Sequence, residues 1–203
     1  MKSLLSCACF CATLLLCLSC KKTPDTIRIG VNAELTGSVP VVGRSCVNAA
    51  QLATDEINAH GGLTVNGKPK MVELLVEDNE DKAESSAAIS QKFVSRRVLA
   101  MIGPNASRNA VPAAVVAESN KLLMISPWST NPKLTENRPH IFRACFTDDF
   151  QGVVVAALIY KRLGFSKAAV LYDMASEYNK GIAEVFKSEF TRAGGTWKTP
   201  STN

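Results

Sequence analysis

The sequence has few of the residues and motifs on which catalysis and metal binding depend. Histidine occurs only at His60 and His140, and neither has potential ligands at the spacing of a metal site. No G-x-G-x-x-G or Walker phosphate-binding motif is present, and Ser126-Pro127 lacks the surroundings of a nucleophile elbow. We therefore predict no enzymatic activity, no catalytic residue, no metal and no cofactor.

Long runs of like charge are also absent. The formal net charge is +5, from 23 Lys and Arg against 18 Asp and Glu, and the positive residues are scattered along the chain. A nucleic-acid-binding face needs denser clustering, so the sequence predicts a solvated surface and no nucleic-acid partner. The apolar fraction of 46% is typical of a soluble globular chain, and 203 residues suffice for one domain and part of another.

The first nineteen residues differ in kind from the rest. Lys2 is followed by an almost wholly apolar run over residues 4–18. This run is shorter than the roughly 20 residues that span a bilayer, so residues 1–19 are predicted to be a secretory signal peptide. The cysteines inside this run are interpreted as small apolar residues of a cleaved segment rather than metal ligands.

A cysteine follows the apolar run directly. Ser19, Cys20 and the two lysines after them resemble a bacterial lipoprotein signal, although Cys17 stands where that pattern usually has leucine. The resemblance implies that Cys20 is lipidated and that residues 20–26 tether the protein to a membrane. Secretion without lipid is the alternative. Cys46 and Cys145 then remain in the mature chain, and we expect two buried free thiols, with a disulfide as the alternative.

Segments typical of strands and helices alternate from residue 27 onward. Strands are predicted at 27–35, 71–76, 98–102, 122–125 and 141–144, with helices at 43–59, 83–94 and 109–118. This alternation predicts an α/β lobe over residues 27–146. Its sheet should be doubly wound and mainly parallel, flavodoxin- or Rossmann-like, and covered on both faces.

The pattern restarts in residues 147–203. A helix at 149–163, a strand at 167–172 and a helix at 177–193 are predicted, but the residues after Gly195 do not read as the next strand. One strand and its helices cannot cover both faces of a sheet. The segment is therefore interpreted as the incomplete start of a second, similar lobe.

Ligands of such sheets bind beyond the carboxyl ends of the strands. This rule directs attention to four loops, at residues 34–43, 78–82, 103–109 and 126–133. Hydroxyl groups are concentrated in the last two. A carboxylate that leaves water needs several donors, and Ser107, Ser129 and Thr130 supply hydroxyl and backbone N–H groups.

Five segments carry a family likeness in their order along the chain. They are IRIGVNAELTGSVPVVGRSCVNAAQLATDEINAHGG (Ile27–Gly62), GPNASRNAVPAA (Gly103–Ala114), MISPWSTNPKLT (Met124–Thr135), FRACFTDDFQG (Phe142–Gly152) and AVLYDMASEYNKGIAEVFKSEF (Ala169–Phe190). They are similar to the opening, the two binding loops, the first hinge crossing and the start of the second lobe in leucine/isoleucine/valine-binding proteins. The chain thus resembles a type I periplasmic binding protein.

This resemblance implies a function. Two α/β lobes would close on a small ligand like a hinged trap. The protein would capture an amino acid, branched-chain or similar, and deliver it to the permease and ATPase subunits of an ABC importer. It would work in the periplasm or at the outer face of the cytoplasmic membrane. The family is about twice as long, so we interpret the chain as truncated or as one part of a split gene. A sensor for an amino acid, amide or urea, and a non-functional remnant, are the alternatives.

The resemblance also implies ligand-binding residues. The family pattern places Val42, Asn105, Ser107, Trp128, Ser129, Thr130 and Tyr178 at the ligand. Ser107 stands at the carboxylate-binding serine, just before a predicted helix whose N-terminus favours an anion. A structural interpretation stays open for several of them. Ser107 could only cap its helix, Trp128 could be an exposed loop residue, and Tyr178 and Val42 could serve packing.

Overall fold

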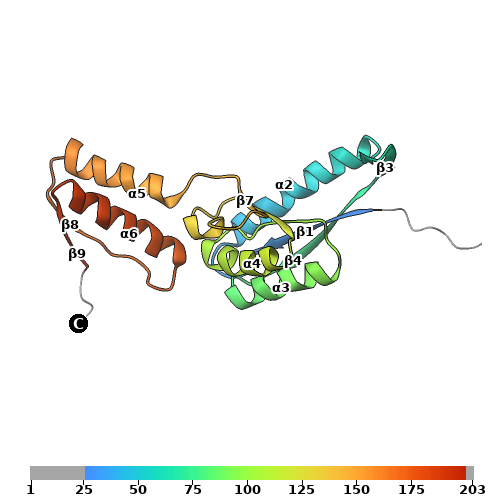
Figure 1. Ribbon diagram of the computed structural model, residues 1–203, viewed down its shortest axis with the longest axis horizontal. Coiled ribbons are helices and arrows are strands. Elements are labelled where there is room, and N and C mark those ends of the chain that lie inside the picture. The colour runs from blue at the N-terminus through green and yellow to red at the C-terminus, as the bar shows by residue number, and fades with distance from the viewer. Residues whose placement is uncertain (1–25, 200–203) are drawn as a thin grey trace, which may run out of the picture.

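The computed structural model describes residues 26–199 and shows a larger and a smaller α/β lobe (Figure 1). The larger lobe contains a five-stranded, all-parallel sheet in the order β4-β1-β5-β6-β7. Its strands are β1 (Ile27–Ala33), β4 (Val72–Asp78), β5 (Ala100–Ile102), β6 (Leu123–Ser126) and β7 (Ile141–Arg143). Apart from a short hairpin, this is the flavodoxin-like strand order, and the predicted fold class is confirmed.

Three helices connect these strands. They are α2 (Pro40–Ala59), α3 (Ala83–Ser95) and α4 (Ser107–Ser119). Helix α2 begins three residues before the predicted start, because Pro40 is well suited to the first turn of a helix. The predicted turn at Asn66-Gly67 joins the hairpin strands β2 (Leu63–Val65) and β3 (Lys68–Lys70). Both turn residues have positive φ, which is typical of a tight hairpin turn.

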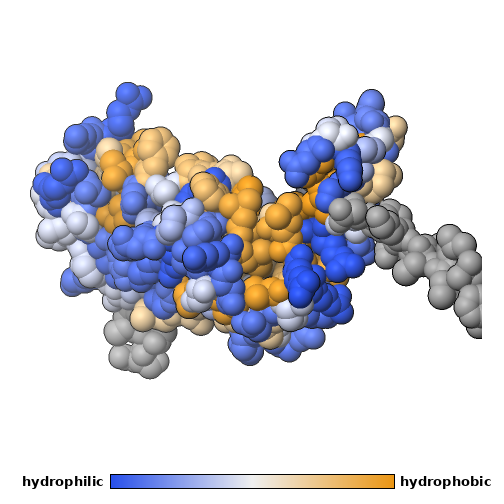
Figure 2. All heavy atoms as spheres, turned by 45° about the vertical axis from the view of Figure 1, so that its right-hand side comes forward, coloured by the Kyte–Doolittle hydropathy of each residue, from blue (hydrophilic) through white to orange (hydrophobic). Residues whose placement is uncertain are grey.

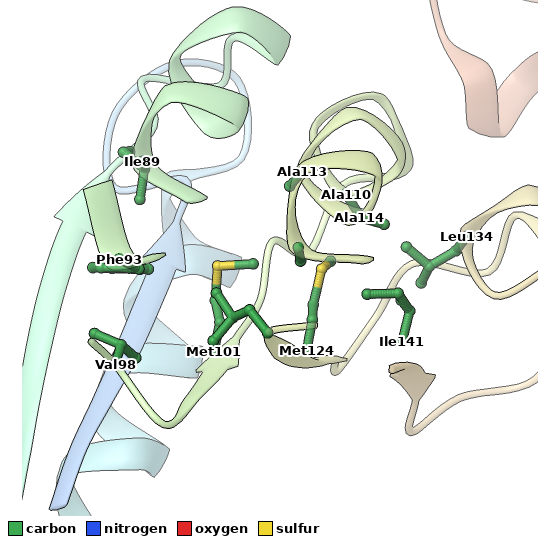
Figure 3. Packing of buried hydrophobic residues seen from close by; sticks show 12 residues of the cluster. Ile89, Phe93, Val98, Met101, Ala110, Ala113, Ala114, Met124, Leu134 and Ile141 are labelled. Carbon is green, nitrogen blue, oxygen red and sulfur yellow. The ribbon is translucent and has the colours of Figure 1, made fainter. Parts of the chain in front are cut away.

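The main hydrophobic core lies between the sheet and helices α3 and α4 (Figure 3). Met101 and Met124 point from β5 and β6 toward these helices, and both side chains are fully buried. Phe93 of α3 lies against Gly30 of β1, where an added Cβ would come within 2.6 Å of its ring. Buried and exposed residues alternate along β6 (Leu123–Ser126) because helices α3 and α4 cover one face of the sheet and successive side chains point to opposite faces.

The opposite face is only half covered, which corrects the prediction of a sheet covered on both faces. Helix α2 packs there against β1 and β4, around Val31 and Ala33. On β6 and β7, Leu123, Ile125 and Phe142 remain 38%, 39% and 48% exposed. Among the described helices, α2 alone packs on this face, and it does not reach those strands. Figure 2 shows a broad hydrophobic area in the middle of the face in view.

The smaller lobe contains two helices and two short strands. They are α5 (Asp148–Ala157), continued by a π-helical turn over Leu158–Arg162, then β8 (Lys167–Ala169), α6 (Glu177–Arg192) and β9 (Thr196–Lys198). Strand β9 pairs in parallel with β8, so the expectation that no strand follows Gly195 is wrong. Phe190 and Phe186 of α6 stack on each other in the core of this lobe.

The two lobes touch beside the chain crossing that joins β7 to α5. The Asn131 side chain donates a hydrogen bond to the Glu177 carbonyl of α6 (2.9 Å), and Asp148 N donates to the Thr130 carbonyl (2.9 Å). Gly181 of α6 allows this helix to approach both residues closely. An added Cβ on Gly181 would lie 3.2 Å from the Asp148 carboxylate and 3.3 Å from the Asn131 amide. These contacts place the N-terminus of α6 opposite the loops of the larger lobe.

Cys46 and Cys145 are free thiols, as expected, although each is only partly buried. Burial raises the pKa of both thiols, which favours their protonated form. The predicted signal peptide, residues 1–19, and the predicted lipidation site, Cys20, lie outside the described residues. No helix within residues 26–199 has the length and apolar content needed to cross a membrane.

Candidate ligand-binding site

A cavity of about 420 Å³ lies where the loops after β5, β6 and β7 face the N-terminus of α6. It is lined by Val39, Asn105, Ala106, Ser107, Arg108, Trp128, Thr130, Cys145, Phe146, Gln151, Ser176 and Tyr178. Its volume is that of a small-molecule site, and its position beyond the carboxyl ends of parallel strands is the one the topology predicts.

The structure brings most of the sequence-predicted residues to this cavity. Asn105, Ser107, Trp128, Thr130 and Tyr178 all line it. The other two predicted residues do not. Ser129 is 1% exposed and lies behind the wall, where its hydroxyl donates a hydrogen bond to the Ser107 hydroxyl (3.0 Å). Val42 is half-buried within α2, and Val39, from the loop before that helix, lines the cavity instead.

The N-terminus of α4 forms the polar end of the cavity. The residue that precedes the helix is Ala106, and no side chain caps it, so the interpretation of Ser107 as a simple cap is wrong. Ser107 is the first helical residue and is 3% exposed. The first N–H groups of a helix have no intrahelical acceptor and carry the positive end of its dipole. Ser107 and Arg108, the first two residues of α4, both line the cavity.

The buried carboxylate of Glu34 holds the loop at residues 103–109, and reasoning from the sequence did not identify it. Glu34 follows β1 and is fully buried. It accepts hydrogen bonds from Asn105 N (3.2 and 3.3 Å to its two oxygens), from the Asn105 side chain (2.9 Å), from Ala106 N (3.1 Å) and from the Asn109 side chain (3.0 Å). The available signal was the position of this carboxylate directly after an apolar strand. A charged group at such a position is buried only if it has hydrogen-bond partners, so its presence indicates that partners lie nearby.

An ion pair joins the same loop to its neighbours. Asp81 accepts hydrogen bonds from the Arg108 guanidinium (2.9 Å from Nε, with a second bond from Nη2), the Asn109 side chain (2.9 Å) and Ser38 N (3.0 Å). Burial raises the pKa of Asp81, but these hydrogen bonds outweigh it and lower the pKa overall. Three of the four predicted loops are thus tied together beside the cavity.

The fourth loop, at residues 126–133, is held from β7. The Arg143 guanidinium donates hydrogen bonds to the carbonyls of Ser129 (3.2 Å), Asn131 (2.9 Å) and Pro132 (3.2 Å), and to the Thr135 hydroxyl (2.8 Å). Burial lowers the pKa of Arg143. These bonds fix the backbone on both sides of Thr130, whose side chain is 6% exposed.

Asp148 lies just behind the site, where the two lobes meet. It is fully buried, and neither carboxylate oxygen has a hydrogen-bond partner of good geometry among the described residues. Burial, and then the charge of Asp149, raise its pKa, while the neighbouring Thr130 hydroxyl and Arg143 oppose the rise. Burial at the junction between the lobes therefore makes the neutral form of Asp148 more favourable than that of an exposed aspartate.

The lining of the cavity combines hydroxyl and amide side chains with three aromatic rings, and among the described residues its one charged side chain is that of Arg108, which is paired with Asp81. Within residues 26–199, no group of three or more His, Cys, Asp and Glu side chains is placed to hold a metal ion. The fold and this site are those of an α/β protein with two lobes and a cavity of small-molecule size between them.

Comparison with known proteins identifies the family. The sequence model described as "Periplasmic binding protein" matches residues 26–202, and the chain belongs to this family. Leu/Ile/Val-binding protein BraC3 of Rhizobium johnstonii is 36% identical over 171 residues, which are 84% of this chain and 45% of that protein. The chain thus spans about half the length of the curated relatives it matches.

Solved structures agree with this assignment. The leucine-binding protein LivK of Thermotoga maritima matches with a TM-score of 0.77 and 34% identity, over 86% of this chain and 48% of that one. The isoleucine complex of LivJ, a branched-chain amino acid transporter substrate-binding protein of Streptococcus pneumoniae, matches with a TM-score of 0.74 and 32% identity, over 88% and 50%. The family contains solute-binding proteins rather than enzymes, as the sequence predicted, and its periplasmic character indicates an extracytoplasmic location.

Proposed function

We propose that the protein is the substrate-binding component of an ABC importer and that it captures an amino acid, branched-chain or similar, between two lobes. The observation that carries this proposal is the polar end of the cavity. Ser107 and Thr130 line the cavity beside the N-terminus of α4, and in this proposal they donate to the carboxylate of the ligand. The names of the relatives supply the ligand class, since BraC3 is a Leu/Ile/Val-binding protein and LivJ was solved with isoleucine.

Each predicted site residue has a proposed part. Ser107 and Thr130 donate to the ligand carboxylate, and Asn105 helps to close that end of the cavity. Ser129 acts indirectly, because its hydrogen bond orients the Ser107 hydroxyl. Trp128 and Tyr178 form the wall around the remainder of the ligand. Val42 stands outside the lining and, in this proposal, packs in α2.

The setting of the protein forms part of the same proposal. A signal peptide over residues 1–19 exports the chain, and lipid on Cys20 with the tether over residues 20–26 holds it at the membrane surface. Residues 27–146 and 147–203 then form the first lobe and part of the second. The loaded protein delivers its ligand to a permease that an ATPase drives. The family membership and the relatives' names support the extracytoplasmic location and the part in transport, whereas the signal peptide and the lipid rest on the sequence of residues 1–22.

Calorimetric titration of the purified chain with leucine, isoleucine and valine tests the proposal. Ser107→Ala should weaken binding by about 1–3 kcal/mol, because a buried carboxylate loses a donor, which is roughly 5- to 150-fold in Kd. Ser119→Ala is the matched control, since Ser119 is an exposed serine at the far end of the same helix. No binding by the unaltered chain, or equal affinity in the Ser107 variant, would contradict the proposal.

A further inference from the structure

One buried carboxyl group lies next to a wall residue of the cavity without lining the cavity itself. Asp148 is the first residue of α5, in the smaller lobe, and its side chain is fully buried. Thr130 follows β6 in the larger lobe and lines the cavity. The Asp148 N–H donates a hydrogen bond to the Thr130 carbonyl (2.9 Å), so the two residues meet across the lobe junction. Thr130 thus touches both the cavity and the residue that carries the buried carboxyl group.

The other donors around this carboxyl group are engaged elsewhere. The Asn131 side chain donates to a carbonyl of α6 (2.9 Å), and both terminal nitrogens of Arg143 donate to the loop after β6. Gly181 brings only backbone to within close approach of the carboxyl group. The Thr130 hydroxyl lies beside Asp148, although not in a hydrogen bond of good geometry. This hydroxyl is therefore the donor for which Asp148 and a ligand can compete.

Charged groups of both signs face Asp148 from the elements packed around it. Arg143 of β7 favours the ionised carboxylate, Asp149 of α5 disfavours it, and the Cys145 thiol of the crossing lies nearby. The other charged residues, in the crevice beside Gly181, are Lys133, Glu136, Glu177, Lys180 and Glu184, of which Lys180 pairs with Glu177. Burial is the largest influence and raises the pKa of Asp148. The group is therefore placed to gain or lose its proton when its surroundings change.

The protonation state of Asp148 decides what the Thr130 hydroxyl can do. A hydroxyl has one hydrogen to donate, and an ionised carboxylate is an acceptor only. An ionised Asp148 therefore competes with the carboxylate of a ligand for the same hydrogen. A neutral Asp148 can instead donate its own hydrogen to Thr130 Oγ1, which leaves the Thr130 hydrogen for the ligand. Two carboxylates on either side of one residue also repel, and this repulsion favours protonation of one of them.

We infer that Asp148 is a positioning residue that couples capture of the ligand to the uptake of one proton at the lobe junction. When the ligand carboxylate enters the cavity, Asp148 binds a proton from the solvent. Its O–H then donates to Thr130 Oγ1, and the Thr130 O–H donates to the ligand. The inference rests on the proposed function, because Thr130 serves the ligand carboxylate there, and it adds regulation of that site by pH.

Thermodynamic linkage gives the sign and the upper limit of the effect. A ligand whose binding raises the pKa of Asp148 binds more tightly to the protonated protein, and the proton in turn binds more tightly to the loaded protein. Affinity should therefore increase as the pH falls. The uptake of one proton changes the affinity by at most about tenfold per pH unit.

Calorimetric titration of the purified chain with L-leucine at pH 5, 6 and 7 tests the inference, since leucine stays a zwitterion over this range. Each titration is repeated in two buffers with different heats of ionisation, which counts the protons that enter on binding. We expect an uptake of about half a proton at its maximum, and binding about three- to tenfold tighter at pH 5 than at pH 7. Binding without proton uptake, or tighter binding at the higher pH, overturns the inference.

Two variants show whether the proton binds at Asp148. Asp148→Asn keeps the shape of the side chain and does not titrate, so it should bind leucine without proton uptake and with affinities at pH 5 and pH 7 that agree within about twofold. Asp149→Asn is the matched control, because Asp149 is the adjacent carboxylate, is exposed and does not line the cavity. The control should retain the proton uptake. Equal uptake in both variants would mean that the proton binds elsewhere, which contradicts the inference.

Thr130→Val tests the role of the hydroxyl. This variant should bind leucine more weakly at every pH, and the difference between pH 5 and pH 7 should shrink to less than about twofold, because the contested hydrogen is gone. A pH dependence that survives intact would contradict the competition for the hydroxyl. If leucine binds, depends on Ser107 and exchanges no proton, only the present inference fails. If leucine, isoleucine and valine do not bind at all, the proposed function fails and the inference fails with it.

Discussion

Replacement of Glu34 by glutamine tests whether the buried carboxylate builds the polar end of the cavity. Oε1 accepts from Ala106 N and the Asn109 side chain, and Oε2 accepts from the Asn105 side chain. A glutamine keeps the shape but replaces one of these acceptors with an NH₂ group. At least one buried donor then loses its acceptor, at about 1–3 kcal/mol, and the remaining bonds lose their charge assistance.

The combined loss should lower the free energy of unfolding by roughly 2–4 kcal/mol, a large share of the 5–15 kcal/mol typical of a domain. Urea denaturation measures this loss, and ligand titration should show weaker binding because the loop at residues 103–109 shifts. Glu73→Gln is the control. Glu73 pairs with Arg28 on the surface, where an ion pair contributes at most about 1 kcal/mol. A Glu34→Gln protein within about 0.5 kcal/mol of the unaltered chain would refute the reasoning.

Two further predictions concern the lobe junction and the bare face of the sheet. The raised pKa of Asp148 means that the folded state holds this proton more tightly than the unfolded state. Its contribution to stability should therefore decline as pH rises above the ordinary carboxyl range, and Asp148→Asn should remove that decline in urea titrations at pH 4–7. A pH-independent difference between the two proteins would contradict this assignment. Separately, Leu123→Thr with Ile125→Thr should reduce self-association in sedimentation, because both side chains are exposed on an uncovered sheet face. Leu52→Thr, on the outside of α2, is the control, and an equal reduction there would show that the sheet face is not the contact.

Local pattern was enough to predict much of the architecture. Apolar β-rich segments alternate with helical spacing from Ile27 onward, and this alone requires crossovers and a parallel sheet. The topology then directs ligands to the loops after the strands, which is where the cavity lies. Ser107 and Thr130 were identifiable for this reason, since they lie on those loops, whereas Trp128 was identified through the family resemblance.

The residues that position the site were not identifiable in this way. Glu34 and Asn105 are 71 residues apart, and Ser107 and Ser129 are 22 apart, so nothing local indicates that each pair shares a hydrogen bond. Arg143 reads as a strand residue, yet it holds the backbone around Thr130. Such partners are decided when strands far apart in the sequence come to lie side by side.

The sequence by itself determined the type and order of the helices and strands, because residue spacing sets which face of each element is apolar. Only the tertiary structure decided that Val39 rather than Val42 reaches the cavity, since the early start of α2 at Pro40 turns Val42 into a helix residue. It also decided that β9 forms beside β8 and that half of one sheet face stays bare. Pairing and covering depend on which elements meet in space, and a one-dimensional pattern does not contain that information.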